Sequence, residues 1–159
     1  MPNASGLRPR FDTVLSKVNI ISGLGATRTL SADESGSVIL LDRAAGIVVT
    51  LPLADPGLVY DFIVTTTVTS NSYKIITGAA TEFLIGGYVN VDTDTSNAVA
   101  AFLGNGSTHI AVTMAATGTN ATGGIQGTKL RFTCLSTTRW MVEGIVEGGG
   151  TVATAFATS

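Results

Sequence analysis

Residue types that often carry catalysis are scarce in this sequence. His109 is the single histidine, so a histidine-based triad or metal site could be built only around it. The nearest serine, Ser107, lies in Asn105-Gly106-Ser107-Thr108, which does not match the Gly-x-Ser-x-Gly pattern of a nucleophile elbow. The sequence therefore favours an exposed histidine beside a hairpin turn, and it predicts no catalytic residue.

A short acidic stretch could offer oxygen ligands to a hard cation. Asn90, Asp92 and Asp94 alternate along the chain with Val91 and Thr93. The glycine and the closing glutamate of a calcium-binding loop are missing, however. We therefore expect a solvated loop here and no metal ligand.

Two further acids near the C-terminus could contact a sugar. Glu143 and Glu147 are four residues apart, which places both side chains on one face of a strand, and Trp140 is close in sequence. Two acids alone are a weak indication of a glycosidase. Gly148-Gly149-Gly150 follows without the lysine or the helix start of a phosphate-binding loop. No cofactor is expected, and the sequence does not indicate an enzyme.

The low charge of the chain limits its partners. Charged residues make up 13% of the 159 residues, about half the usual share, whereas 45% are hydrophobic. The formal net charge of −2 argues against a nucleic-acid partner, which would require clustered lysine and arginine. No apolar run is long enough to span a membrane, and Met1-Pro2-Asn3 does not begin a signal peptide. One small core cannot bury so much apolar surface, so we expect a homo-oligomer.

Glycine and proline divide the chain into short apolar runs that read as strands. Residues 36–41, 47–52 and 58–64 are predicted to form an antiparallel meander. Further runs follow to residue 146, and Gly104-Asn105-Gly106 predicts a hairpin that pairs 98–103 with 109–114. About nine or ten such strands are typical of an all-β sandwich or barrel, and we expect it to be antiparallel.

Alternation along these runs predicts the core. Cys134, the single cysteine, shares a strand face with Leu130 and Phe132 and is expected to be a small buried hydrophobe. The residues expected to be mostly buried are Val38, Leu40, Val49, Leu51, Tyr60, Phe62, Ile75, Phe83, Ile110, Val112, Leu130, Phe132 and Trp140.

The chain is expected to have three parts, which are an N-terminal arm over residues 1–29, a β body over 30–147 and a glycine-rich tail over 148–159. Two interpretations of the arm stay open. It is either a frayed terminus or an extended segment that orders on a partner. The candidate partner-binding residues combine apolar anchors with positive charge: Leu7, Arg8, Arg10, Phe11 and Leu15.

Three segments together resemble the head decoration, or cement, proteins of tailed bacteriophages. The first begins with Leu30-Ser31-Ala32-Asp33-Glu34-Ser35-Gly36 and ends with Thr50-Leu51-Pro52. The second joins Phe62-Ile63-Val64 to residues 68–75, and the third runs from Gly127-Thr128-Lys129-Leu130 through 140–144 into the tail. The resemblance covers residues 30–159, and the same opening pattern recurs in phage tail and fibre components.

The resemblance implies a structural virion protein. Such proteins bind the outer surface of the major capsid protein shell, often as trimers, and cross-brace its subunits. The chain would then be made in the host cytoplasm and located on the capsid, with its arm against the shell. The alternative is a tail- or fibre-associated or glycan-binding β module, in which Tyr88, Trp140 and Glu143 would face a common groove.

Overall fold

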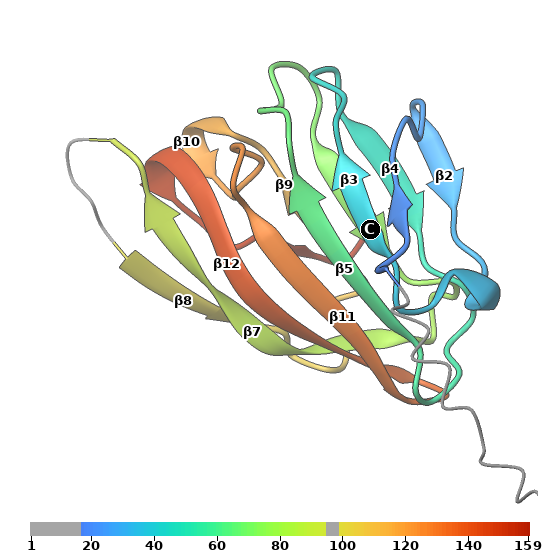
Figure 1. Cartoon of the computed structure of the whole chain (residues 1–159). Coiled ribbons are helices and arrows are strands. Elements are labelled where there is room, and N and C mark those ends of the chain that lie inside the picture. Colours follow the sequence, from blue (N-terminus) through green and yellow to red (C-terminus); the bar gives the residue numbers. More distant parts are fainter. Residues whose placement is uncertain (1–16, 95–98) are drawn as a thin grey trace, which may run out of the picture.

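The chain folds as an all-β sandwich. The computed structural model describes residues 17–94 and 99–159, with the side chains of 117–121 excepted, and Figure 1 shows two packed sheets. The turn-bounded apolar runs therefore predicted the fold class correctly. The larger sheet has eight strands in the order β1-β3-β5-β11-β12-β7-β8, with β10 pairing with β12, and the smaller sheet has the order β13-β9-β6-β4-β2.

The strand bounds are as follows. The larger sheet contains β1 (Ile20–Ile21), β3 (Val38–Leu41), β5 (Val59–Val64), β7 (Phe83–Asp92), β8 (Val99–Leu103), β10 (Thr117–Ala121), β11 (Lys129–Ser136) and β12 (Arg139–Val152). The smaller sheet contains β2 (Thr27–Thr29), β4 (Ile47–Thr50), β6 (Tyr73–Ile76), β9 (Ala111–Met114) and β13 (Phe156–Ala157). One turn of 3-10 helix, η1 (Ala32–Glu34), precedes β3.

The prediction of antiparallel sheets is wrong, because both sheets are mixed. The pairs β1–β3, β3–β5, β2–β4, β4–β6, β7–β12 and β10–β12 are parallel. The first six strands alternate between the two sheets, so each strand returns beside the strand two places before it. The chain over β1–β6 therefore winds as a short, flattened solenoid. Its parallel pairs join strands of successive turns, and local alternation in the sequence does not reveal such pairs.

The predicted meander and the predicted hairpin are consequently replaced by crossings between the sheets. Residues 36–64 were predicted to form a meander, but the structure places β4 in the smaller sheet, away from β3 and β5. Likewise β8 pairs with β7, whereas β9 pairs with β6 and β13. The carboxamide oxygen of Asn105 accepts the backbone N–H groups of Ser107, Thr108 and His109 at 3.0, 3.0 and 3.1 Å. This side-chain-held turn carries the chain from one sheet to the other.

Both predicted terminal segments contribute strands where the structure describes them. β1 and β2 belong to the segment predicted as an arm, and they pair with β3 and β4. The end of β12 and all of β13 belong to the segment predicted as a tail. The five candidate residues of the arm, Leu7, Arg8, Arg10, Phe11 and Leu15, lie outside the described residues.

The core lies between the two sheets. Nine of the predicted core residues are buried, and so is Cys134, as predicted: Val49, Leu51, Tyr60, Phe62, Ile75, Val112, Leu130, Phe132 and Trp140. The rings of Phe62 and Phe132 meet edge to face with centroids 5.3 Å apart. The inward face of β3 was predicted wrongly, and the remaining two residues are less buried than the core. Val38 and Leu40 point outward while their neighbours in β3 are fully buried, and Phe83 and Ile110 are only half-buried.

A buried carboxylate links the core to the loop after β4. Glu82 is almost fully buried and accepts two hydrogen bonds, from the backbone N–H of Ala54 at 2.8 Å and from the indole Nε1–H of Trp140 at 3.2 Å. Satisfied buried groups of this kind fix neighbouring elements relative to one another.

Candidate functional site

The His109 side chain packs against a neighbouring ring of the fold. Its ring is half-buried and stacks on Phe156 with centroids 5.4 Å apart and an interplanar angle of 7°. Its Nδ1 accepts the backbone N–H of Asn105 at 3.2 Å. The expectation of an exposed histidine is therefore wrong, because the Asn105 turn folds the imidazole against the last strand.

The acidic stretch of β7 faces inward. Asn90 and Asp92 are buried, because strand alternation puts them on the side of Tyr88. The side-chain amide of Asn90 donates to the Ala153 carbonyl at 3.4 Å, and the Asp92 carboxylate accepts the backbone N–H of Asp94 at 3.0 Å. The solvated loop is thus a wrong prediction for Asn90 and Asp92. In the described part of the chain, no cluster of three or more His, Cys, Asp or Glu could hold a metal ion.

The predicted sugar-binding groove does not form from its three residues. Tyr88 and Trp140 are buried, and only Glu143 points outward. The phenol oxygen of Tyr88 accepts the backbone N–H of Ala155. Even-numbered and odd-numbered positions of β12 face opposite sides, so Trp140 and Glu143 cannot share a surface.

The outer face of the larger sheet brings exposed side chains from many strands together. Figure 1 views the sandwich from this side, with β8, β7, β12, β11 and β5 lying side by side. Strand register places one outward row across it, made of Leu103, Gly87, Glu143, Arg131, Asp61 and Val38. This face is therefore polar in the middle and apolar towards both edges.

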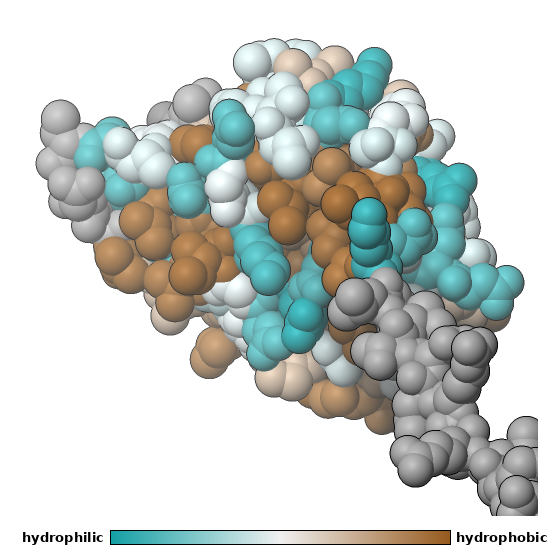
Figure 2. Space-filling model, viewed as in Figure 1, coloured by the Kyte–Doolittle hydropathy of each residue, from teal (hydrophilic) through white to brown (hydrophobic). Residues whose placement is uncertain are grey.

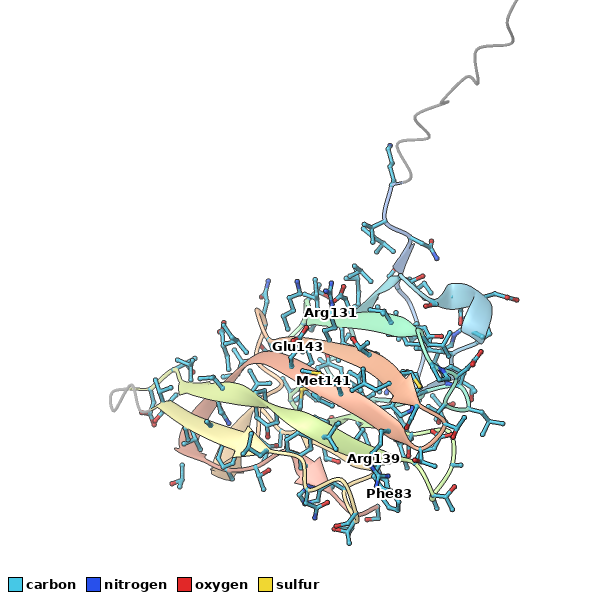
Figure 3. All side chains as sticks on the ribbon, turned by 90° about the horizontal axis from the view of Figure 1, so that it is seen from below. Phe83, Arg131, Arg139, Met141 and Glu143 are labelled. Atoms are coloured by element: carbon cyan, nitrogen blue, oxygen red, sulfur yellow. The ribbon has the colours of Figure 1, made fainter. Side chains whose placement is uncertain are left out.

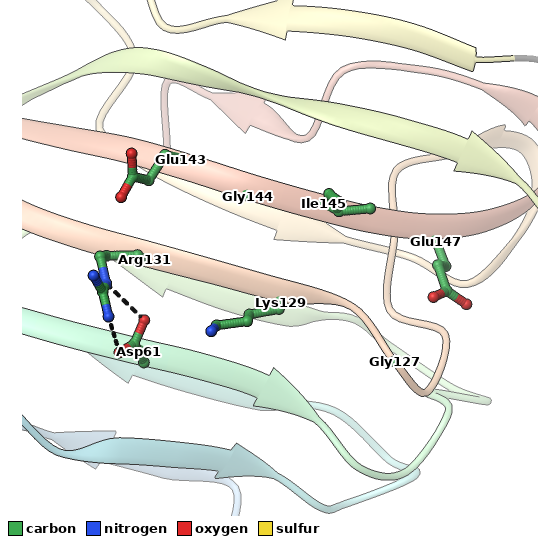
Figure 4. A pocket seen from close by; sticks show the side chains of 8 residues that line it. All are labelled: Asp61, Gly127, Lys129, Arg131, Glu143, Gly144, Ile145 and Glu147. Carbon is green, nitrogen blue, oxygen red and sulfur yellow. Dashed lines mark hydrogen bonds and ion pairs between the residues drawn. The ribbon is translucent and has the colours of Figure 1, made fainter. Parts of the chain in front are cut away.

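A charged hollow occupies the middle of this face. Arg131 donates two hydrogen bonds to Asp61, from Nε at 2.9 Å and from the terminal nitrogen at 2.7 Å, and these bonds lower the pKa of Asp61. With Lys129, Glu143 and Glu147 the pair lines a shallow hollow of about 580 Å³ (Figure 4). Its donors and acceptors suit polar side chains of a partner, and the lining includes no histidine, serine or cysteine.

An apolar patch adjoins the charged hollow. We call it the β8 patch, and it consists of Val89, Val99, Leu103 and Ile145, which are 36, 66, 75 and 54% exposed. These residues come from three neighbouring strands, and the patch is a brown area at the left of Figure 2. Val89 and Leu103 of the patch line a shallow hollow of about 280 Å³ together with Gly86, Gly87 and Gly144, which have no side chains to fill it.

The opposite edge of the same sheet is also apolar. Val18 and Ile20 are 59 and 61% exposed, and the exposed Lys17 precedes them. We call these three residues the β1 edge. The half-buried Val38, Leu40 and Ile63 extend from it across β3 and β5, and Figure 2 shows a second brown area on the far side of the polar band.

Figure 3 shows the same face from another side. Arg131, Met141 and Glu143 are labelled on the outer surface of β11 and β12. At the end of the sheet the Arg139 guanidinium lies 5.3 Å from the centroid of the Phe83 ring (Figure 3). This cation–π contact keeps a partly exposed ring covered.

The sequence did not single out this face, although one signal was available. β8 reads Val-Ala-Ala-Phe-Leu, so both of its faces are apolar, yet its outward residues are exposed. A strand that is apolar on both faces is typical of a strand covered on both sides. Its exposed side therefore makes this face the candidate binding surface of the molecule.

No helix in the described residues is long and apolar enough to cross a membrane. Comparison of the chain with protein-family models, with curated proteins and with solved structures found no match.

Proposed function

We propose that this protein decorates and stabilises a phage capsid by binding the outer surface of the major capsid protein shell. The observation that supports the proposal is the charged hollow in the outer face of the larger sheet, whose donors and acceptors stay open to a partner between the two apolar edges. Such a face is typical of a surface that binds another protein. The resemblance of residues 30–159 to decoration proteins supplies the class of partner.

The proposed complex is a homo-oligomer, most readily a trimer, on the capsid of the virion. Its N-terminal arm contacts the shell through Leu7, Arg8, Arg10, Phe11 and Leu15, which combine apolar side chains with positive charge. An extended segment of this composition can order on an acidic surface as it binds. The protein would be made in the host cytoplasm and added to the shell there.

Purified virions test the proposal. We expect the protein in intact particles at a fixed ratio to the major capsid protein, and particles that lack it should release their genome at a lower temperature. Deletion of residues 1–16, which spares β1, should leave the circular dichroism spectrum unchanged and weaken attachment to stripped particles. Absence of the protein from purified particles would contradict the function, and unchanged attachment would contradict the role of the arm alone.

The alternative is a tail- or fibre-associated or glycan-binding module. Tyr88 and Trp140 are buried, so sugar binding would require a surface other than the predicted groove. A glycan array separates the two proposals, because decoration predicts no saturable binding. Antibody labelling in electron micrographs would distinguish a location on the head from one on the tail.

A further inference from the structure

We infer that the β8 patch of one copy packs against the β1 edge of the next copy, so that identical chains join head to tail in a closed ring. The inference rests on the oligomer in the proposed function and assigns the two surfaces that form it. Its test uses the purified protein alone, so it can fail or succeed independently of capsid binding.

Both surfaces expose apolar side chains that favour burial. Leu103 is 75% exposed and Val99 66%, and on the other surface Ile20 is 61% exposed. The gain on burial grows with the apolar area removed from water, so several such side chains together can drive association. Leu103 lies over Gly87, where an added Cβ would be 2.6 Å from its Cδ2 atom, so the glycine seats this side chain.

One copy cannot bring its own two surfaces together. β1 and β8 are the two edges of the larger sheet, with five strands between them. Six strand spacings of about 4.8 Å separate them by roughly 29 Å. A contact between the β8 patch and the β1 edge must therefore join different copies, and contacts between two different surfaces produce rings when the rotation closes.

The charges bordering the two surfaces are complementary. Glu143 and Glu147 adjoin the β8 patch on β12, and Lys129 lies beside Ile145, which leaves this border with a net negative charge. Lys17 supplies positive charge at the β1 edge. Neither of the two ion pairs between described residues involves Lys17, Glu143 or Glu147. Complementary rims of this kind set the orientation of docking.

Strand direction also suits this contact. β1 runs parallel to β3 and β5, β5 is antiparallel to β11, and β11 is antiparallel to β12. β12 and β7 are parallel, and β8 reverses direction. A neighbouring copy whose strands keep this direction would therefore bring β1 to β8 in antiparallel sense, the sense in which β7 already lies beside β8.

Light scattering after size-exclusion chromatography provides the first test. At micromolar concentration we expect about three times the 16.2 kDa chain mass. Leu103→Lys should weaken association at least tenfold and yield monomer. Leu53→Lys is the matched control, because Leu53 is 70% exposed and lies outside both surfaces, and it should leave the mass unchanged. A monomeric wild-type protein, or equal effects of the two substitutions, would overturn the inference.

Mixing two variants tests the head-to-tail arrangement directly. Ile20→Lys disables the β1 edge and Leu103→Lys disables the β8 patch, so each variant alone should be monomeric. Their mixture retains one intact pair of surfaces and should form a complex of two chains. If the β8 patch instead paired with itself, Ile20→Lys alone would still associate and mixing would rescue nothing. Val18→Lys replaces Ile20→Lys if the latter unfolds, since Val18 precedes the strand.

Discussion

Replacing Glu82 should test how strongly one buried carboxylate holds the sandwich together. Glu82→Ala removes the acceptor for two buried donors, the Ala54 backbone N–H and the Trp140 indole N–H. A buried donor without a partner costs about 1–3 kcal/mol, so the two together should lower the free energy of unfolding by roughly 2–6 kcal/mol. The free energy of unfolding of a typical domain is about 5–15 kcal/mol, so the expected loss is a large share of it.

Urea unfolding at fixed protein concentration would measure the loss. Glu82→Gln keeps the shape and one acceptor oxygen, so about half of the effect should remain. The exposed Asp33, changed to alanine, is the control and should alter stability by less than about 0.5 kcal/mol.

A double-mutant cycle would isolate the indole contact. Trp140→Phe removes the indole N–H, so in the Glu82→Ala background it should cost less than it does alone, with a coupling energy of about 0.5–3 kcal/mol. Additive effects, or a Glu82→Ala variant as stable as the wild type, would refute the assigned role of this carboxylate.

Three further predictions concern the core, a turn and alkaline pH. Phe132→Ala should cost about 3–5 kcal/mol in urea unfolding, because Phe132 is fully buried against Phe62, and a loss below about 1 kcal/mol would contradict this. Gly46 and Gly36 have φ angles of 81° and 82°, but only at Gly46 would a Cβ collide with the Ser72 backbone, so Gly46→Ala should destabilise more than Gly36→Ala in thermal unfolding. Burial raises the pKa of Tyr60 to about 12 and also raises the pKa of Tyr73 and Tyr88. Their contribution to stability is present below pH ~10 and lost as pH rises through the folded pKa values, so absorbance should show tyrosine ionisation together with unfolding, and ionisation in a still folded protein near pH 10 would contradict it.

Alternation in the sequence predicted where the strands lie and, for most of them, which side chains face the core. It did not predict which strands pair with one another. In β11, Leu130, Phe132 and Cys134 are buried as the period-two pattern requires. In β3 every residue is apolar, so the pattern contained no information on which set faces inward, and Val38 and Leu40 were chosen wrongly. Parallel pairing depends on contacts between residues far apart in sequence, which no local pattern encodes.

The polar positions were harder to predict for a different reason. Asn90 and Asp92 are buried in a strand, and the tertiary fold supplies the Ala153 carbonyl that accepts the hydrogen bond of the Asn90 amide. The candidate site was missed because its apolar residues resemble core residues in the sequence. Only the fold shows that Val99 and Leu103 stay exposed.

The order of strands in the larger sheet has a consequence for how the chain folds. β1, β3 and β5 form one piece of that sheet and β7 and β8 another, and the β11–β12 hairpin lies between them. The two pieces can form early, but they stay separate until the hairpin inserts, with β11 joining β5 and β12 joining β7. Because this step joins residues distant in sequence, it should be slow. The β1 edge and the β8 patch become parts of one rigid face only then, so an incompletely folded chain would lack the geometry to enter the proposed ring.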